Sequence, residues 1–156
     1  MLQTKKKTRP AAKVAHDADD YILGDQPGFL LRVALRTHTA IFVSKMVENL
    51  TPPQFSTLAK LREVGPCSQN HLGRLIHYDS ATITGVIKRL RARGLIESCE
   101  DPIDRRRHAI DLTREGRRIA DEAIAMVTEI SSTTFAPLTV AERRTLTNLL
   151  KKVIER

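Results

Sequence analysis

The apolar positions of residues 29–50 follow the repeat of a helix. Leu31, Leu35, Phe42 and Met46 are spaced by four and seven residues, which places them on one face. Further apolar residues widen this surface: Val33, Ile41, Val43 and Val47. A helix that is apolar over much of its circumference must be buried on several sides. In a small protein, this pattern suggests that a helix of a second subunit packs against it.

Three shorter helices are predicted between residues 51 and 94. Thr51 is followed by two prolines and by Gln54, a capping arrangement that begins a helix, and Gly65 ends that helix. A second, short helix follows the cap residue Ser68.

The third of these helices, over residues 80–93, separates apolar from polar residues cleanly. Asp79 is its cap, and Gly94 ends it because glycine favours the left-handed backbone found after helices. Its apolar residues are spaced i, i+3, i+4 and i+7: Ile83, Val86, Ile87 and Leu90. One face of this helix is therefore predicted to be buried and the other to be exposed.

A β-hairpin is predicted next, because residues 95–99 and 108–112 have strand patterns and a polar loop joins them. Thr113 then begins a long helix, which Pro137 interrupts. A capping box at Thr139 begins the last helix. That helix carries an apolar face predicted to be buried: Leu146, Leu149, Leu150, Val153 and Ile154. The whole pattern predicts a mainly α fold with a small β-hairpin.

Residues 1–25 show no hydrophobic periodicity. They hold a cluster of Lys and Arg followed by aspartates, a composition typical of a disordered tail. The lysines are either solvated or in contact with DNA phosphates. We therefore predict a basic tail over residues 1–25 and a single domain over residues 26–156.

The composition favours a polyanionic partner. The 156 residues contain 26 Lys and Arg against 18 Asp and Glu, a formal charge of +8, which favours nucleic acid first and an anionic membrane surface second. Aromatic residues make up 4% and Trp is absent, which argues against a surface that stacks single-stranded bases. No stretch approaches the roughly 20 apolar residues that span a bilayer, and no secretory signal is visible. A cytoplasmic protein without a membrane partner is expected.

Three short helices followed by a hairpin with a basic tip describe a winged helix-turn-helix. The exposed face of the helix over residues 80–93 presents small and hydroxyl side chains, which let a helix approach base edges in the major groove. We predict base contacts from Ser80, Thr82 and Thr84, where Thr82 either meets a thymine methyl or donates a hydrogen bond. Lys88 and Arg89 are better placed for phosphates. The alternative is an ordinary amphipathic helix with a polar outer face.

The predicted hairpin tip carries three consecutive arginines, Arg105, Arg106 and Arg107. An arginine on a narrow projecting loop suits the negative potential of a narrow minor groove. Asp104 indicates an ion pair that shapes the loop. The alternative is a solvated run of charges.

Other chemistry finds little support in the sequence. The five histidines are scattered without metal-ligand spacing, so no metal and no cofactor are expected. No nucleophile elbow, phosphate loop or paired-carboxylate motif is visible, so we do not expect an enzyme. Cys67 and Cys99 are interpreted as ordinary buried thiols, with a redox sensor as the alternative.

Two segments resemble the MarR family of winged helix-turn-helix transcriptional regulators. The first runs from the predicted recognition helix into the strand: Asp79-Ser80-Ala81-Thr82-Ile83-Thr84, Lys88-Arg89-Leu90 and Arg93-Gly94-Leu95-Ile96. The second is the wing: Asp101-Pro102-Ile103-Asp104-Arg105-Arg106-Arg107, followed by Asp111-Leu112-Thr113-Arg114-Glu115-Gly116. The resemblance extends more weakly over residues 29–156.

The resemblance implies a homodimer that reads a pseudo-palindromic DNA operator. It places the winged helix-turn-helix at about residues 51–112 and the dimerisation helices at about 28–50 and 113–156. It maps the arginine that enters the minor groove onto Arg106, braced by Asp104 and Arg107. Gly85 departs from the family pattern, because many relatives carry a larger side chain there.

Several further segments resemble the subgroup of the family that represses nicotinate degradation: Asp20-Tyr21-Ile22-Leu23, Phe29-Leu30-Leu31-Arg32, His38-Thr39-Ala40-Ile41-Phe42 and Gly65-Pro66-Cys67-Ser68-Gln69-Asn70. This similarity implies a repressor that a small aromatic carboxylate, a hydroxynicotinate, releases from DNA.

Because effectors of this family bind between the dimerisation helices and the DNA-binding lobe, the resemblance points to residues of the first helix as ligand candidates: Arg32, Arg36, His38, Thr39 and Phe42. Arginine can pair with a carboxylate and histidine can bond a ring substituent. The alternatives are surface ion pairs for the arginines and a structural role for His38.

The sequence thus predicts a DNA-binding transcriptional repressor. The alternative is a winged-helix module that binds proteins and has no DNA specificity.

Overall fold

The computed structural model describes residues 21–100 and 108–155 of the chain. Two compact units, residues 1–34 and 35–156, are described separately. The described part of the first unit contains the 3-10 turn η2 (Leu23–Asp25) and the beginning of helix α1 (Pro27–Lys45), which ends in the second unit. The described part of this unit is therefore mainly helical.

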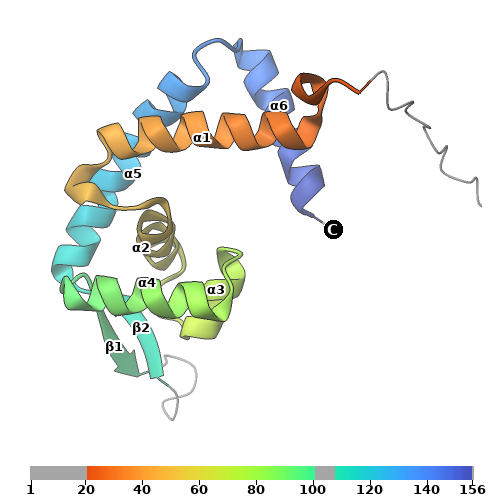
Figure 1. Cartoon of the computed structure of the whole chain (residues 1–156). Coiled ribbons are helices and arrows are strands. Elements are labelled where there is room, and N and C mark those ends of the chain that lie inside the picture. Colours follow the sequence, from red (N-terminus) through yellow and green to blue (C-terminus); the bar gives the residue numbers. More distant parts are fainter. Residues whose placement is uncertain (1–20, 101–107, 156) are drawn as a thin grey trace, which may run out of the picture. The chain divides into compact units, whose positions relative to one another are not determined.

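The second unit contains the predicted elements in the predicted order (Figure 1). After α1 and the 3-10 turn η3 (Val47–Asn49) come three helices, a hairpin and two helices. Their bounds are α2 (Pro52–Val64), α3 (Gln69–Leu75), α4 (Ser80–Ala92), β1 (Ile96–Glu100), β2 (His108–Leu112), α5 (Arg114–Thr134) and α6 (Val140–Ile154). The predicted mainly α fold with a small hairpin is confirmed.

The first helix is shorter than the hydrophobic pattern predicts. The pattern continues to residue 50, but α1 ends at Lys45. Met46 is extended, with ψ 132°, and Glu48 and Asn49 have φ values of 55° and 50°, in the left-handed region. Met46 and Leu50 are nevertheless buried. The chain turns here to bury both side chains, and the apolar spacing alone does not distinguish this turn from more helix.

The core of the second unit lies where α2 packs on α5 and where α3, α4 and the hairpin contact α2. Leu58 and Leu61 of α2, Leu72 of α3 and Ile130 of α5 are completely buried. The start of α2 follows the predicted capping box, because the Thr51 backbone N–H donates to Gln54 Oε1 at 3.0 Å. The predicted start of α2 is thus confirmed.

The hairpin pairs β1 and β2 antiparallel, with Ile96 opposite Leu112. The first strand begins and ends one residue later than predicted. Cys67, before α3, adds a bridge on the other side of β2, since its N–H donates to Ile110 O at 3.2 Å and its carbonyl accepts from Ile110 N at 2.9 Å. Cys67 is buried as predicted, but Cys99 is only half-buried, because it lies in a strand at the edge of the hairpin.

The last helix, α6, corrects a prediction of burial. Its capping box is confirmed: Glu142 Oε2 accepts from the Thr139 hydroxyl at 2.7 Å and from Thr139 N at 2.8 Å, and these bonds lower the pKa of the Glu142 carboxyl. The apolar face, however, is open in the single chain: Leu149, Val153 and Ile154 are 54%, 55% and 61% exposed. A helix whose apolar face finds no cover within its own chain calls for a partner surface.

Gly116 fixes the approach of α5 to the end of α4. Thr113 caps α5 by accepting from Gly116 N at 3.0 Å, as predicted for a helix that begins at Thr113. A Cβ atom added at Gly116 would lie 1.8 Å from Leu95 O. Since the obstacle is backbone, only glycine lets this turn of α5 lie against Leu95.

We expect Gly116→Ala to lower the free energy of unfolding by at least about 2 kcal/mol, because overpacking a close contact forces the backbone apart. Urea unfolding followed by circular dichroism measures this. Gly28→Ala is the matched control, because Gly28 also lies in the first turn of a helix and an added Cβ meets nothing within 4 Å. Equal stability of the Gly116→Ala and Gly28→Ala proteins would contradict the prediction.

Candidate nucleic-acid interface

Helices α3 and α4 form a compact helix-turn-helix. His77, in the turn, has φ 57°, and Tyr78 N donates back to Gly73 O at 2.9 Å. Gly73 is buried, and a Cβ there would lie 3.3 Å from both Ile83 Cγ2 and Tyr78 O. The small residue at position 73 therefore allows α3 to pack closely against the beginning of α4.

Asp79 caps α4 as predicted. Its carboxylate accepts from Thr82 N at 2.7 Å and from the Thr82 hydroxyl at 2.9 Å. Both bonds lower the pKa of the Asp79 carboxyl, and the bond from the Thr82 backbone N–H has the larger effect. The carboxylate also complements the positive end of the helix dipole. The first turn of α4 is thereby held in one conformation.

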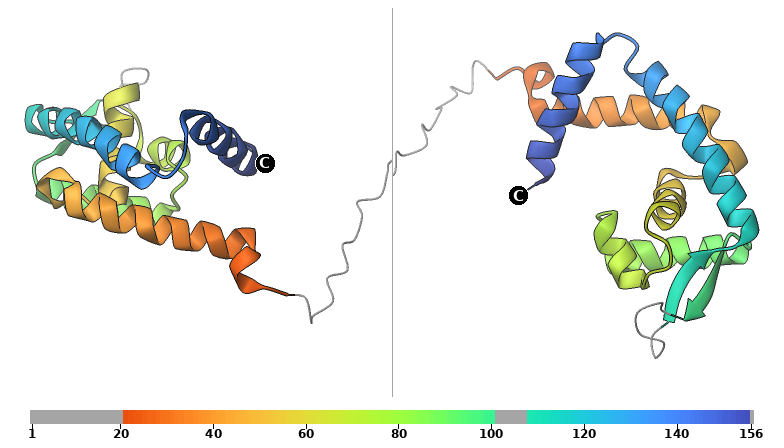
Figure 2. Two further views of the ribbon diagram at one scale, coloured as in Figure 1. Left: turned by 90° about the horizontal axis from the view of Figure 1, so that it is seen from above. Right: turned by 180° about the vertical axis from the view of Figure 1, so that it is seen from behind.

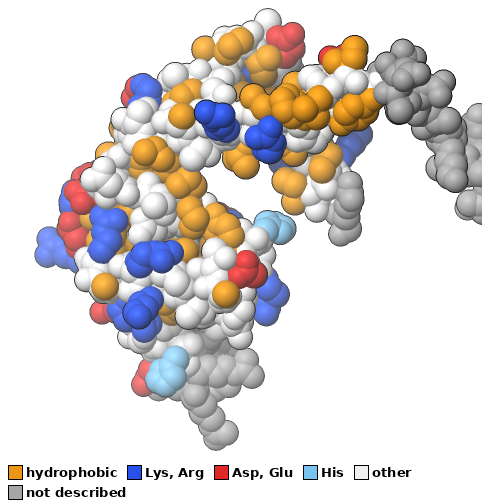
Figure 3. Space-filling model, in the orientation of Figure 1, with side chains coloured by type: hydrophobic (Ala, Val, Ile, Leu, Met, Phe, Trp, Pro, Cys, Tyr) orange, Lys and Arg blue, Asp and Glu red, His pale blue; other side chains and the backbone are white. Residues whose placement is uncertain are grey.

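The predicted division of α4 into two faces is confirmed. All four residues of the apolar stripe, Ile83, Val86, Ile87 and Leu90, are at least 97% buried, since their exposed fractions lie between 0% and 3%. The opposite side is open: Ser80, Ala81, Thr84, Lys88 and Arg89 are exposed, and Thr82 is half-buried. Figure 3 shows Lys and Arg side chains gathered over the part of the surface that α4 occupies. This face is polar, basic and accessible.

The two threonine hydroxyls of this face already have partners within the protein. Two roles were predicted for Thr82, a contact with a thymine methyl and a hydrogen bond donated to a base. Because the Thr82 hydroxyl donates to Asp79, only the methyl contact leaves this bond intact. Thr84 donates to Ser80 O at 2.7 Å and accepts from Gln69 Nε2 at 2.8 Å. Both threonine hydroxyls therefore donate their hydrogens within the protein, and their methyl groups can contact a ligand.

Gln69, at the start of α3, was not among the predicted site residues. Its amide reaches across to Thr84 on α4. A polar residue right after the cap Ser68 is the only signal in the sequence, and it does not reveal a contact between two helices.

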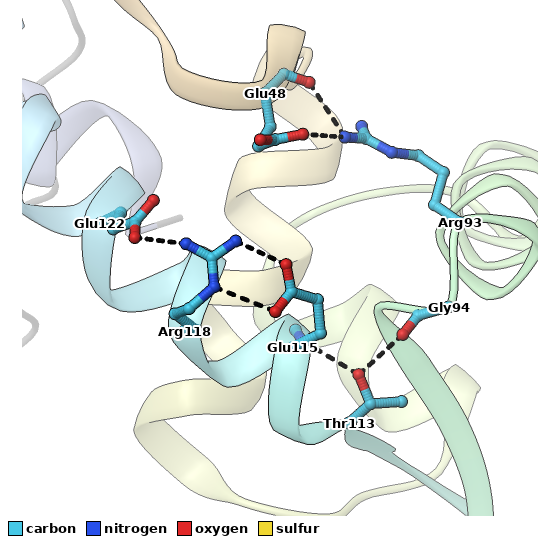
Figure 4. Close-up of polar contacts among 8 residues, drawn as sticks. Glu48, Arg93, Gly94, Thr113, Glu115, Arg118 and Glu122 are labelled. Atoms are coloured by element: carbon cyan, nitrogen blue, oxygen red, sulfur yellow. Dashed lines mark hydrogen bonds and ion pairs between the residues drawn. The ribbon is translucent and has the colours of Figure 1, made fainter.

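The far end of α4 is tied to two neighbouring segments (Figure 4). Arg93 Nη2 donates to Glu48 O at 3.0 Å and lies 3.5 Å from Glu48 Oε2. The Thr113 hydroxyl donates to Gly94 O at 2.7 Å, and Gly94 has the predicted left-handed backbone, with φ 69°. Arg118 nearby joins Glu115 and Glu122 on the surface of α5, which lowers the pKa of the Glu115 carboxyl. The position of α4 is thus set at both of its ends.

The hairpin lies beside α4, with β1 and β2 paired antiparallel (Figures 1 and 2). That segment, residues 101–107, lies outside the described residues. The wing residues Asp104, Arg105, Arg106 and Arg107 belong to it, and their predicted roles are not tested by the structure.

The ligand candidates of α1 fall into separate groups. His38 Nδ1 lies 3.0 Å from Thr134 Oγ1, and the His38 ring faces Phe135 with the ring planes 19° apart. Phe42, one turn along α1, is buried and lies 6.3 Å from His38 between ring centroids. The structure thus brings His38 and Phe42 together and adds Thr134, the last residue of α5, and Phe135, which follows it; sequence reasoning missed both because Thr134 lies 96 residues from His38.

The remaining candidates do not join this cluster within the second unit. Arg36 is exposed and Thr39 is half-buried. Arg32 belongs to the first unit, where its guanidinium lies 5.1 Å from the centre of the Phe29 ring, a cation–π contact.

The hydrogen bonds of Thr134 define the ring form of His38. Thr134 Oγ1 donates its single hydrogen to Ile130 O at 2.9 Å. Toward His38 it can therefore only accept, so Nδ1 carries the hydrogen of the ring. In the neutral ring, Nε2 is then an acceptor, and no described residue bonds to it.

Among the described residues, no group of three or more His, Cys, Asp or Glu side chains could hold a metal ion. Within the same residues, no helix has the length and apolar character required to cross a membrane.

A helix-turn-helix with an exposed second helix, followed by a hairpin, defines a winged helix-turn-helix protein. Residues 50–108 match the profile of the MarR family. The transcriptional repressor NicR of Pseudomonas putida is 39% identical over 96% of this chain and 95% of its own length. The chain therefore belongs to the MarR family of transcriptional regulators.

Solved structures of relatives agree with this assignment. BpsR of Bordetella bronchiseptica, described as regulated in DNA binding by 6-hydroxynicotinic acid, has a TM-score of 0.81 and 38% identity, covering 87% of this chain and 98% of that one. A MarR variant of Escherichia coli complexed with operator DNA has a TM-score of 0.73 and 25% identity, covering 81% and 91%.

We expect Asp79→Ala to lower the thermal midpoint at pH 7 by a few degrees, because the first turn of α4 loses its cap. Asp79→Asn is the matched control, since an amide oxygen can still accept from Thr82 N. Because the pKa of the folded carboxyl is lowered, its contribution is present above the ordinary value of about 4 and is lost as the pH falls through the folded value. Midpoints of wild type and Asp79→Ala that differ equally at pH 7 and pH 2 would contradict this account.

Proposed function

We propose that this protein is a repressor that binds duplex DNA as a homodimer and reads a pseudo-palindromic operator. The observation that carries the proposal is the face of α4. Its apolar residues are buried, its two ends are anchored, and its small, hydroxyl and basic residues are exposed. Such a helix enters the major groove, with Ser80, Thr82 and Thr84 near base edges and Lys88 near phosphate.

The homodimer is supported by apolar surface that the single chain leaves open. On α6 this surface includes Leu149, Val153 and Ile154. An apolar groove at the beginning of the same helix is lined by Leu146 and Leu149 and by Leu138, which precedes the helix. Leu35 and Val43 of α1 are each 62% exposed. A second copy of the chain would cover such faces and place two α4 helices one turn of B-form DNA apart.

The wing is proposed to add a contact in the minor groove. Arg106 would enter the groove, and Asp104, with Arg105 and Arg107, would shape or flank the tip. This part of the proposal rests on the sequence and on the position of β1 and β2 beside α4. A regulator that acts on DNA in this way is proposed to work in the cytoplasm.

The proposed effector is a small aromatic carboxylate such as 6-hydroxynicotinate, the compound named for BpsR. His38 supports this choice, because its Nε2 acceptor suits a ring hydroxyl or N–H, and Phe42 and Phe135 are aromatic neighbours for a flat ring. Because His38 on α1 bonds Thr134 on α5, a ligand at this point would act on two helices proposed to form the dimer.

DNA binding is tested by fluorescence anisotropy with the palindromes that lie upstream of the gene and with a shuffled duplex. We expect the palindrome to bind more tightly, with affinity falling about 10³-fold or more between 50 and 200 mM salt, because phosphate contacts release counterions. Arg106→Ala is expected to weaken palindrome binding about tenfold or more.

Lys60→Ala is the control for Arg106→Ala, because it removes the same charge from a side chain already paired with Glu63. Light scattering gives the mass of the unbound protein. A monomer at micromolar concentration, or equal and salt-insensitive binding of palindrome and shuffled duplex, would overturn the proposal in favour of a protein-binding module.

Effector binding is tested by thermal unfolding with 6-hydroxynicotinate. At a concentration about 100-fold above Kd, mass action adds about 2.7 kcal/mol, a rise of several degrees. We expect His38→Ala to lose this rise and Arg36→Ala to lose it only if Arg36 pairs with the carboxylate. Benzoate, which lacks the ring hydroxyl and nitrogen, is the control ligand. An undiminished rise in His38→Ala would exclude the histidine from the effector site.

A further inference from the structure

On the exposed side of α4, Gly85 has no side chain, and the guanidinium of Arg89 lies in the space beside it. Gly85 and Ala81 lie opposite the buried stripe, so they occupy the middle of the exposed face. An added Cβ at Gly85 would lie 3.6 Å from Arg89 Nη2 and 3.7 Å from Arg89 Nη1. The next nearest atom, Arg89 Cζ, would be 3.9 Å away. The guanidinium of Arg89 therefore rests beside the bare backbone of Gly85.

The geometry of a helix explains this placement. Side chains tilt toward the N-terminal end of their helix, and residues four apart lie on the same side. Arg89 thus reaches back over position 85, one turn closer to Ser80. A Cβ alone would meet the guanidinium at ordinary van der Waals distance, but a longer side chain at position 85 would take its place.

The guanidinium of Arg89 is available to a ligand. Its side chain is exposed and makes no hydrogen bond or ion pair with any described residue. The neighbouring arginines are engaged: Arg91 donates to Ser98 Oγ at 2.9 Å and Arg93 to Glu48 O at 3.0 Å. Arg89 therefore keeps all of its planar donors near the middle of the helix face.

We propose that Arg89 reads a guanine in the major groove and that Gly85 creates the space from which it does so. This inference rests on the proposed function of α4 as the recognition helix. A planar pair of N–H donors matches the O6 and N7 acceptors of guanine. A residue so close to the base-reading end of the helix sets specificity, whereas Lys88, a point charge on the same face, contacts phosphate.

The test begins with selection from a library of random duplexes, using the wild type, Arg89→Ala, Arg89→Lys and Lys88→Ala proteins. We expect the wild type to enrich a palindrome with one guanine fixed in each half-site. Arg89→Ala and Arg89→Lys are expected to lose this guanine and to keep the other fixed positions. Lys88→Ala is expected to keep every preference and to bind all duplexes more weakly.

Position 85 supplies a matched pair of variants. Gly85→Ala leaves room for the guanidinium and is expected to keep the guanine, whereas Gly85→Leu displaces Arg89 and is expected to lose it. Replacing the fixed guanine by 7-deazaguanine, which lacks the N7 acceptor, is expected to weaken wild-type binding about tenfold and to leave Arg89→Ala binding unchanged.

The outcomes separate the two proposals. If the wild type enriches no palindrome, the proposed function itself fails. If it does, and Arg89→Ala keeps the same fixed guanine while binding all duplexes more weakly, Arg89 is a phosphate contact and the inference is wrong. Circular dichroism of each variant confirms the helical content. Arg89 is exposed and Gly85 is half-buried, and neither belongs to the core.

Discussion

Burial of one stripe of α4 governs the arrangement of everything that faces outward from the proposed DNA-binding surface. Leu90 is completely buried, and Ile83 and Val86 are each 99% buried. Each such side chain contributes about 1.5–3 kcal/mol when removed from water, so rotating the helix about its axis would cost more than a small domain can lose. The polar face of α4 is exposed because the apolar face on the opposite side packs into the core.

Hydrogen bonds then hold this face in place at several points. Asp79 holds the first turn, while Glu48 and Thr113 hold the turn where the helix ends. The threonine hydroxyls of the face are bonded within the protein, so their methyl groups and the donors of Arg89 remain for a ligand. A recognition surface ordered in advance loses less conformational entropy on binding.

Helices α1 and α6, outside the winged helix-turn-helix, carry more apolar surface than one chain covers. Val153 of α6 remains 55% exposed although the helix is well capped. The contact of His38 with Thr134 joins α1 to α5, two of the helices proposed to form the dimer. In the proposed function, the surfaces that make the dimer thus also connect the effector to the spacing of the two α4 helices.

Local chain chemistry was enough to derive the order of the elements, the caps at Thr51, Asp79, Thr113 and Thr139, and the buried side of α4, because periodicity and capping involve residues within one or two turns of each other. Local patterns did not predict the features that depend on contacts between segments far apart in the sequence. The end of α1 at Lys45, the bridge from Cys67 to the hairpin and the bond from Gln69 to Thr84 each depend on contacts between separate elements. Only the folded chain brings these atoms within contact distance, so no local sequence pattern predicts these contacts.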